Sequence, residues 1–345
     1  MGRLLRCGLC AALMQLIAVC IAPFATVAAA ETGGFYEGKS ITVIVGNPSG
    51  GGYDVYARLL ARHMGKYLPG RPPFIVQNMP GAGSLNAAQH LANIATKDGT
   101  AIGVVAPGAI FDPLIEGQSK FRYQPGKFEY IGSADSGTRI CFTSKQSGIQ
   151  SIHDARKNKV VVATTAPQSA GQDYALLMNA LAGTKFEVVL GYKGPPDLLL
   201  AMERGEAAGV CALDSATVVS LRPDWLEGDK INLLVQAGLH PSPDIRAPSM
   251  WEFIKGDERA VAELIVSQQE FGRPFLAPPG IPTEQLRLLR ESFSAALKDP
   301  ELLGEAQKMK LGVSPKSGEE VAAIINKLYG ASPDLVERAR RILRP

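Results

Sequence analysis

Short apolar runs alternate with amphipathic stretches along most of the chain. The apolar runs are rich in Val and Ile and predict buried strands, which we place at 40–45, 74–76, 101–105, 128–132, 139–143, 160–164, 186–190, 208–213 and 231–235. The amphipathic stretches predict helices, which we place at 55–64, 85–94, 151–155, 174–181 and 197–204. Strands and helices that alternate in this way form parallel βαβ units, so the pattern predicts an α/β protein. We expect the run at 139–143 to continue the strand at 128–132.

The last hundred residues follow a different pattern. Seven prolines interrupt 240–282, where we place no strand, and four helices are predicted beyond them, at 283–297, 300–310, 318–329 and 333–343. We expect these helices to pack back on the first part of the chain. The sequence therefore predicts two α/β lobes, each with a mainly parallel sheet flanked by helices. Residues 31–134 plus 240–345 form the first lobe, and residues 135–239 form the second.

Residues 1–30 have the pattern of a secretory signal peptide. Arg3 and Arg6 give a positive start, 9–24 is apolar, and three alanines at 28–30 give a small-residue cleavage site. The apolar stretch is shorter than the roughly 20 residues that span a bilayer. We therefore expect the leader to be cleaved rather than to anchor the chain, which predicts a soluble exported protein.

Charge and cysteine content narrow the function further. Beyond the leader the chain carries 34 basic and 33 acidic residues, a balance that favours neither nucleic acid nor a membrane surface as a partner. The two cysteines beyond the leader, Cys141 and Cys211, lie in predicted strands. In an oxidising compartment they either form a disulfide or stay as two buried thiols, and the sequence leaves both open. The four histidines are scattered and no CxxC occurs beyond the leader, so we predict neither a metal site nor a cofactor.

Two glycine-rich turns stand at the ends of the first two predicted strands. Both precede a predicted helix, and glycines let the backbone come close to a ligand and aim N–H groups at it. The helix start adds unpaired donors and partial positive charge, so the natural ligand is an anion. We predict ligand contacts from Ser49, Gly50, Gly51, Gly52, Tyr53 and Asp54 in the first turn, and from Asn78, Gly81, Ala82, Gly83 and Ser84 in the second. Asp54 also has the position of a helix cap.

Neither turn fits a nucleotide-binding motif. A P-loop needs Gly-Lys-Ser/Thr after its glycines, whereas Tyr53 and Asp54 follow Gly52. A dinucleotide fingerprint needs a third glycine, and the second turn has Asn86 there. The chain also lacks a G-x-S-x-G nucleophile elbow. We therefore predict binding rather than catalysis.

Further candidates come from strand ends in the second lobe, because ligands of parallel sheets sit outside the carboxyl ends of the strands. The polar turn at 164–171 offers Thr165, Gln168 and Ser169, either as ligand contacts or as a helix cap. We expect Tyr192 either to contact the ligand or to stand in a solvated turn. We expect Asp214 either to accept a hydrogen bond from a ligand hydroxyl or amine, or to belong to a structural turn.

Several segments, in their order along the chain, resemble the Bug-type solute receptors, the substrate-binding proteins of tripartite tricarboxylate transporters. These segments are Pro-Ser-Gly-Gly-Gly-Tyr-Asp at 48–54, Val-Gln-Asn-Met-Pro-Gly-Ala-Gly at 76–83, Lys-Asp-Gly-Thr at 97–100, Gly-Tyr-Lys-Gly at 191–194, Ala-Met-Glu-Arg-Gly-Glu at 201–206 and Ala-Pro-Pro-Gly-Ile-Pro at 277–282. The resemblance covers almost the whole chain beyond the leader.

The resemblance implies a type II periplasmic binding protein whose two lobes close on a small carboxylate. It also implies that backbone groups of the two glycine-rich turns hold one carboxylate, with ordered water, and that the second lobe selects the rest of the ligand. The chain departs from the family pattern at Tyr53, where many members have Thr or Ser, and at 164–171, which lacks the usual Ser-Gly-x-Gly. A phenol at position 53 would stack on the ligand, bond to it or shrink the pocket.

With that resemblance, the sequence predicts a monomeric periplasmic receptor that captures a small organic carboxylate and passes it to the membrane subunits of a permease. Two other functions stay open. The same fold could present its ligand to a membrane kinase as a sensor, or the chain could be an exported hydrolase. The ligand itself stays open among mono-, di- and tricarboxylates.

Overall fold

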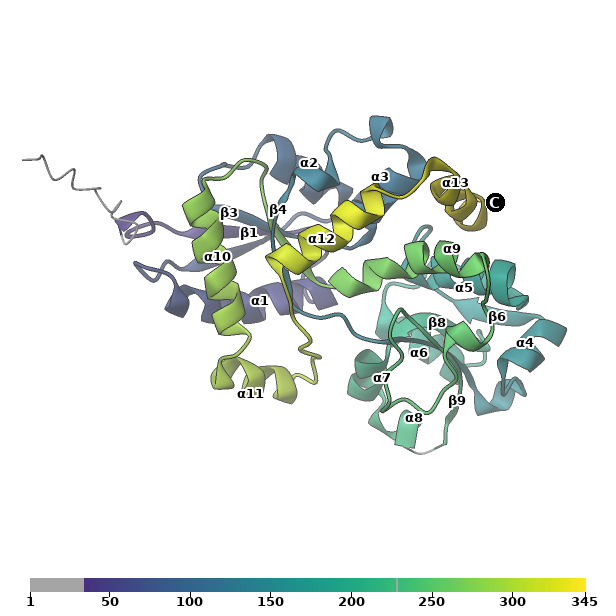
Figure 1. Cartoon of the computed structure of the whole chain (residues 1–345). Coiled ribbons are helices and arrows are strands. Elements are labelled where there is room, and N and C mark those ends of the chain that lie inside the picture. The colour runs from purple at the N-terminus through teal and green to yellow at the C-terminus, as the bar shows by residue number, and fades with distance from the viewer. Residues whose placement is uncertain (1–33, 228) are drawn as a thin grey trace, which may run out of the picture. The chain divides into compact units, whose positions relative to one another are not determined.

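The computed structural model describes residues 34–227 and 229–345, and the predicted leader lies outside them (Figure 1). The described strands form two sheets. The first contains β1 (Ile41–Val45), β2 (Phe74–Asn78), β3 (Ala101–Val104), β4 (Glu129–Ser133), β10 (Pro274–Ala277) and β11 (Lys316–Ser317), in the order β11-β4-β10-β3-β1-β2. The second contains β5 (Arg139–Ser144), β6 (Val160–Ala163), β7 (Phe186–Val189), β8 (Gly209–Asp214) and β9 (Ile231–Ala237), in the order β7-β6-β8-β5-β9. The predicted α/β fold class is confirmed.

Both sheets are mixed, which corrects the expectation of mainly parallel sheets. In the first sheet β1 is parallel to β2 and β3, whereas β10 is antiparallel to β3 and β4, and β11 is antiparallel to β4. In the second sheet β6 is parallel to β7 and β8, whereas β5 is antiparallel to β8 and β9. Alternating strands and helices predict parallel pairing only for strands that a helical crossover joins. The chain passes between the two sheets at the links from β4 to β5 and from β9 to β10, and all four of these strands have antiparallel neighbours; β11 is a two-residue strand at the edge of the first sheet.

Two details of the strand prediction were also wrong. Residues 139–143 do not continue β4, because β4 and β5 belong to different sheets and 134–138 links them. β10 was missed because prolines surround it. Pro274 occupies the first position of the strand, where a missing N–H is tolerated.

Helices pack against both sheets. The described α-helices are α1 (Gly52–Met64), α2 (Leu85–Asn93), α3 (Gly108–Glu116), α4 (Ile152–Lys157), α5 (Ala170–Ala182), α6 (Pro195–Glu203), α7 (Ser215–Leu221), α8 (Pro223–Glu227), α9 (Glu258–Val266), α10 (Thr283–Ala296), α11 (Pro300–Lys308), α12 (Gly318–Tyr329) and α13 (Pro333–Leu343). α1 packs on β1 and β2, α10 and α12 pack on β4, and α5 packs on β7 and β8 (Figure 1). No helix in the described part of the chain has the length and apolar character needed to cross a membrane.

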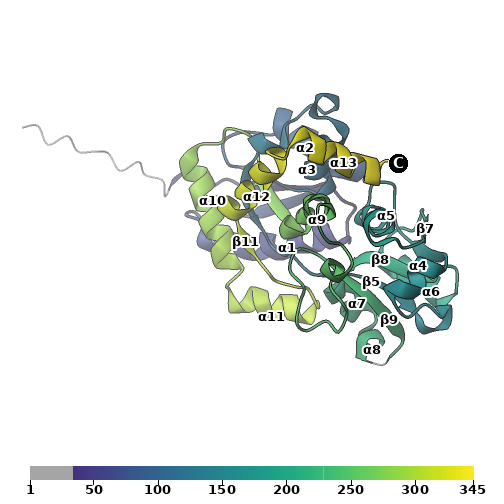
Figure 2. The same cartoon turned by 45° about the vertical axis from the view of Figure 1, so that its right-hand side comes forward.

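The C-terminal helices contact elements beside both sheets. As expected, α10 and α12 pack on the first sheet, but α9 and α13 also contact α5, which covers the second sheet (Figure 2). Tyr174 of α5 donates a hydrogen bond to the carbonyl of Val266. Arg344, just after α13, pairs with Asp112 of α3 at 3.4 Å and with Asp173 of α5 at 3.1 Å. The end of the chain therefore joins α3 to α5.

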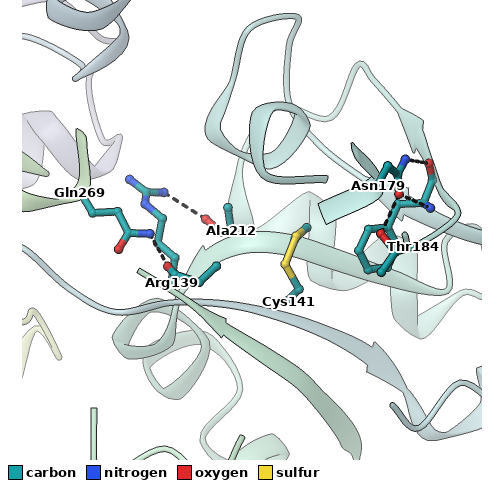
Figure 3. The surroundings of a disulfide bond; sticks show 9 residues. Arg139, Cys141, Asn179, Thr184, Ala212 and Gln269 are labelled. Atoms are coloured by element: carbon teal, nitrogen blue, oxygen red, sulfur yellow. Dashed lines mark hydrogen bonds between the residues drawn. A yellow bond between two sulfur atoms is a disulfide. The ribbon is translucent and has the colours of Figure 1, made fainter. Parts of the chain in front are cut away.

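A disulfide links the two central antiparallel strands of the second sheet. Cys141 of β5 and Cys211 of β8 are joined through their sulfur atoms, 70 residues apart in the sequence (Figure 3). Both side chains are buried. The pairing of β5 with β8 shifts register between Ile140 and Phe142, at Cys141 itself. Of the two arrangements that the sequence left open, the structure has the bonded one.

Candidate functional site

The two glycine-rich turns lie side by side because β1 and β2 are neighbours in the sheet. Gly46 permits their close approach, since a Cβ atom at this position would stand 2.5 Å from the Ser84 side chain. The Ser84 hydroxyl donates to the carbonyl of Gly46 and contacts Asn47 Oδ1, both at 3.1 Å, and it accepts from the N–H of Ala106 at 3.0 Å. Ser84 thus fastens the second turn to the first and to the end of β3.

Asp54 joins the same two turns from the other side. Its carboxylate accepts from the N–H of Gly50 at 2.8 Å, from Asn78 Nδ2 at 2.8 Å, from Arg58 Nε at 2.9 Å and from the Ser49 hydroxyl at 3.5 Å. Burial acts to raise the pKa of this carboxyl, but the hydrogen bonds from Arg58, Gly50 and Asn78 outweigh it and hold the pKa below its ordinary value. With four protein donors, Asp54 organises the turns. It is not the N-cap of α1, as the cap interpretation expected, because Gly51 holds that position and no described side chain caps the helix.

The start of α1 presents unpaired backbone donors at the first turn. Gly51 is the N-cap residue, and the first helical hydrogen bond runs from the N–H of Val55 to the carbonyl of Gly51 at 3.0 Å. The N–H groups of 52–54 therefore have no acceptor within the helix. These donors, together with the helix dipole, favour an anion at this end of α1.

The second turn has a left-handed backbone throughout. Residues 81–84 have φ angles of 132°, 46°, 62° and 78°. For Ala82 and Ser84 this conformation costs about 1 kcal/mol or more each, and it persists only where the surroundings impose it. Across the described residues, the N–H groups of Ala82 and Gly83 find no protein acceptor. The turn therefore adds two free donors next to those of α1.

A cation that the sequence prediction missed lies against the first turn. The guanidinium of Arg273 stacks over the ring of Tyr53 at 4.7 Å and over the ring of Tyr56 at 5.2 Å. Its Nη2 atom lies 3.7 Å from the point where a Cβ on Gly52 would stand. Tyr53, the residue that departs from the family pattern, thus contacts an arginine of the protein. The available signal was a single arginine inside the apolar stretch 271–277.

Two acidic residues lie near this arginine. Asp135, at 5% exposure, follows β4, and its Oδ2 atom is 3.4 Å from the hydroxyl of Tyr56, which donates to the carbonyl of Gly312 at 2.6 Å. Burial raises the pKa of Asp135 to about 6, and the charge of Asp214 adds to this rise. Asp214, at the end of β8, contacts Gly137, where any Cβ would stand 2.0 Å from Oδ2. The structure therefore places Asp214 beside the segment 134–138, which links β4 to β5.

The remaining candidates, which follow strands β6 and β7 of the second sheet, form a separate group. The carbonyl of Thr165 accepts from the N–H of Gly191 at 3.1 Å, which joins the turn at 164–171 to the turn that carries Tyr192. The hydroxyl of Ser169, at the N-cap of α5, bonds to Thr164 at 2.8 Å, and it accepts no hydrogen bond from the helix backbone. Gln168 is exposed with φ of 60°. Among the described residues, no hydrogen bond or ion pair joins these candidates to the glycine-rich turns.

One cluster has the composition of a metal site. His63, Asp299 and Glu301 bring their ligand atoms within 4.8 Å of one another. The ammonium group of Lys66 lies among them, 3.2 Å from Asp299 and in contact with Glu301. A cation of the protein already neutralises these carboxylates, so the cluster is an ion-pair network.

Two cavities lie away from the glycine-rich turns. One of about 640 Å³ is lined by α10 and the start of α12, including Leu286 and Phe293. Another of about 700 Å³ is lined by α9, α12 and α13, including Leu264, Ile324 and Leu335. Neither is lined by a residue that the sequence predicted for the ligand site.

Several solved structures of bacterial proteins, solute-binding proteins among them, share this fold. A TctC solute binding protein from Polaromonas has a TM-score of 0.64 and 17% identity to this chain, over 88% of this chain and 97% of that protein. MatC from Rhodopseudomonas palustris, solved with bound malate, has a TM-score of 0.64 and 20% identity, over 88% of this chain and 99% of that protein. A second protein from R. palustris, solved with adipate, has a TM-score of 0.65 and 19% identity, over 87% of this chain and 97% of that protein. No protein-family model and no curated protein matches the chain.

These likenesses confirm, at the level of the fold, the predicted resemblance to Bug-type receptors. A periplasmic binding protein named BugD is also similar, with a TM-score of 0.60 and 20% identity. The chain has the α/β fold of this group, with two mixed sheets flanked by helices.

Proposed function

We propose that this protein is a periplasmic receptor that captures a small organic carboxylate and delivers it to a membrane permease of the tripartite tricarboxylate type. The observation that carries the proposal is the pair of glycine-rich turns, held side by side by Ser84 and Asp54. Unpaired N–H groups at the start of α1 and at 82–83 suit the oxygens of a carboxylate. Such donors are preorganised, so little ordering is needed on binding.

Proteins of the same fold support the carboxylate as ligand. MatC was solved with malate and another R. palustris protein with adipate, and both ligands are small carboxylates. The disulfide between Cys141 and Cys211 supports an oxidising compartment such as the periplasm.

The proposal is tested by a thermal-shift screen followed by titration calorimetry on the protein without its leader. The panel contains acetate, lactate, succinate, malate, adipate, citrate and benzoate, with amino acids and sugars as the comparison set. A ligand at about 1,000 times its Kd stabilises the folded state by about 4 kcal/mol, so a true ligand raises Tm clearly. We expect a carboxylate to do so. A sugar or an uncharged amine as the best ligand, with no response to the carboxylates, would contradict the proposal.

A pair of glycine variants then tests the turns. Gly83, with φ of 62°, and Gly148, with φ of 70°, both have open space where a Cβ would stand. Valine is strained at either position, because β-branched residues avoid this conformation. Gly83→Val distorts the second turn, whereas Gly148→Val distorts an exposed turn of the second lobe. We expect only Gly83→Val to lose carboxylate binding.

Delivery to a permease is tested in cells. Uptake of the labelled carboxylate found in the screen is measured in the host strain with and without the gene for this protein. We expect uptake to fall when the gene is removed and to return with the wild-type gene. Unchanged uptake would argue against a role in transport and in favour of sensing.

A further inference from the structure

Arg273 is a buried cation beside the first turn that forms no direct ion pair in the described part of the chain. It stands between Gly272 and β10, and its Nη1 atom donates to the carbonyl of Gly272 at 2.9 Å. Its Nε atom is buried and has no hydrogen-bond partner. Its charge is felt by the carboxylates of Asp214 and Asp135, but neither forms a direct ion pair with it among the ion pairs of the described residues. A buried charge is costly without a partner, so this arrangement needs an explanation.

Aromatic rings hold the guanidinium against the start of α1. It stacks on Tyr53 and Tyr56, and these two residues belong to α1 itself. Stacking on aromatic faces leaves the N–H groups of an arginine, which lie in its plane, available to an acceptor. The Nη2 atom, which makes no hydrogen bond among the described residues, faces the position of Gly52 at the head of the helix. The cation and the free helical N–H groups therefore lie at the same place.

We propose that Arg273 recognises the charge of the ligand, so that the bound carboxylate forms the direct ion pair that this arginine does not make within the protein. The inference rests on the proposed function and adds a specificity-determining side chain to a site otherwise made of backbone donors. An arginine can bond both oxygens of a carboxylate, which a neutral amide or a sugar hydroxyl cannot match. Tyr53 then serves the ligand indirectly, because it orients Arg273.

The nearby acidic residues narrow the ligand class. The charges of Asp214 and Asp135 both act on Arg273, and Asp135 is also close to the Tyr56 hydroxyl. With both carboxylates ionised, these three side chains sum to a charge of −1. A second carboxylate on a short ligand would be repelled by the two aspartates, whereas a hydroxyl or ammonium group would not. The site therefore favours a small monocarboxylate whose other groups are neutral or positive.

The test compares a charged ligand with its neutral counterpart. Titration calorimetry measures the Kd of the tightest-binding carboxylate of the panel and of its primary amide, with wild type, Arg273→Gln and Arg273→Lys. Arg156→Gln is the matched control, because Arg156 also donates to one carbonyl, that of Ala182 at 2.6 Å, and stacks on a ring, that of Phe253 at 5.5 Å. Thermal melting of each variant verifies that it is folded.

We expect Arg273→Gln to weaken carboxylate binding by about 10- to 100-fold, the range for a hydrogen bond to a charged group. The Kd of the amide should change little, so the preference for carboxylate over amide collapses. Arg273→Lys should recover part of that preference, and Arg156→Gln should leave it intact. We also expect lactate to bind wild type more tightly than malate, which is lactate with a second carboxylate.

The outcomes separate this inference from the proposed function. If no panel carboxylate binds wild type, the proposed function fails. If a carboxylate binds and Gly83→Val abolishes binding, while Arg273→Gln keeps the full preference over the amide, the proposed function stands and the role of Arg273 is refuted. Malate binding more tightly than lactate would refute the monocarboxylate class.

Discussion

Removal of the Asp54 side chain should loosen both glycine-rich turns at once. In Asp54→Ala, the first turn loses the acceptor for the N–H of Gly50, and the second loses its link through Asn78. The side chain is only 2% exposed, so its hydrogen bonds are shielded from water. The variant therefore tests whether the joint position of the two turns matters for binding.

The cost is less than the sum of the lost bonds. A hydrogen bond to a charged group contributes about 1.5–3 kcal/mol. The Arg58 side chain is 44% exposed, so in the variant it can form hydrogen bonds with water instead. The Asn78 side chain keeps its hydrogen bond to the carbonyl of Asn47 at 2.9 Å. Only the bond to Gly50 has no replacement within the protein. We therefore expect a loss of about 2 kcal/mol in the free energy of unfolding, within the range for one hydrogen bond to a charged group.

Urea unfolding measures this loss, and titration calorimetry measures the affinity for the panel carboxylate. We expect the affinity to fall at least about tenfold, which is about 1.4 kcal/mol. Asp154→Ala is the control, because Asp154 at the start of α4 accepts from the N–H of Gln150 in the same way, at 3.1 Å, in the second lobe. It should leave the affinity unchanged. A folded Asp54→Ala protein with wild-type affinity would refute a site built on the two turns.

Two further predictions concern stability. Replacing Cys141 and Cys211 together by alanine opens a link across 70 residues, for which the chain-entropy relation gives a loss of about 4 kcal/mol, measurable by urea unfolding; a loss below about 1 kcal/mol would contradict this. Burial, and then the charge of Asp173, raises the pKa of Asp112 from 3.8 to about 7 against the opposing charge of Arg344. The folded protein therefore binds a proton more tightly than the unfolded chain does, so stability should fall as pH rises from about 4 through 7, by at most about 4 kcal/mol from this residue. Asp112→Asn should flatten the dependence of urea midpoints on pH over this range, and an unchanged slope would show that Asp112 does not cause it.

Local features of the site could be predicted from the sequence. The strand before Gly46, the glycine-rich turn and α1 depend on neighbouring residues, so their pattern is visible in one short segment. The same holds for the role of Asp54 near the helix start, since its partners Gly50 and Arg58 are four residues away on either side.

Features that depend on distant segments could not be predicted. Arg273 stacks on Tyr53, which is 220 residues earlier, and only the insertion of β10 between β3 and β4 brings them together. β10 itself gives a weak signal, because prolines flank it. The bond between Cys141 and Cys211 likewise depends on the register of β5 against β8, which local patterns do not specify.

The central claim is that a carboxylate binds where the two turns and Arg273 meet. A crystal structure of the protein with the tightest-binding panel carboxylate tests it most directly. The account predicts that the carboxylate oxygens lie within hydrogen-bond distance of backbone N–H groups at 52–53 and 82–83. A ligand seated elsewhere, such as in the cavity of about 700 Å³ between α9, α12 and α13, would contradict it.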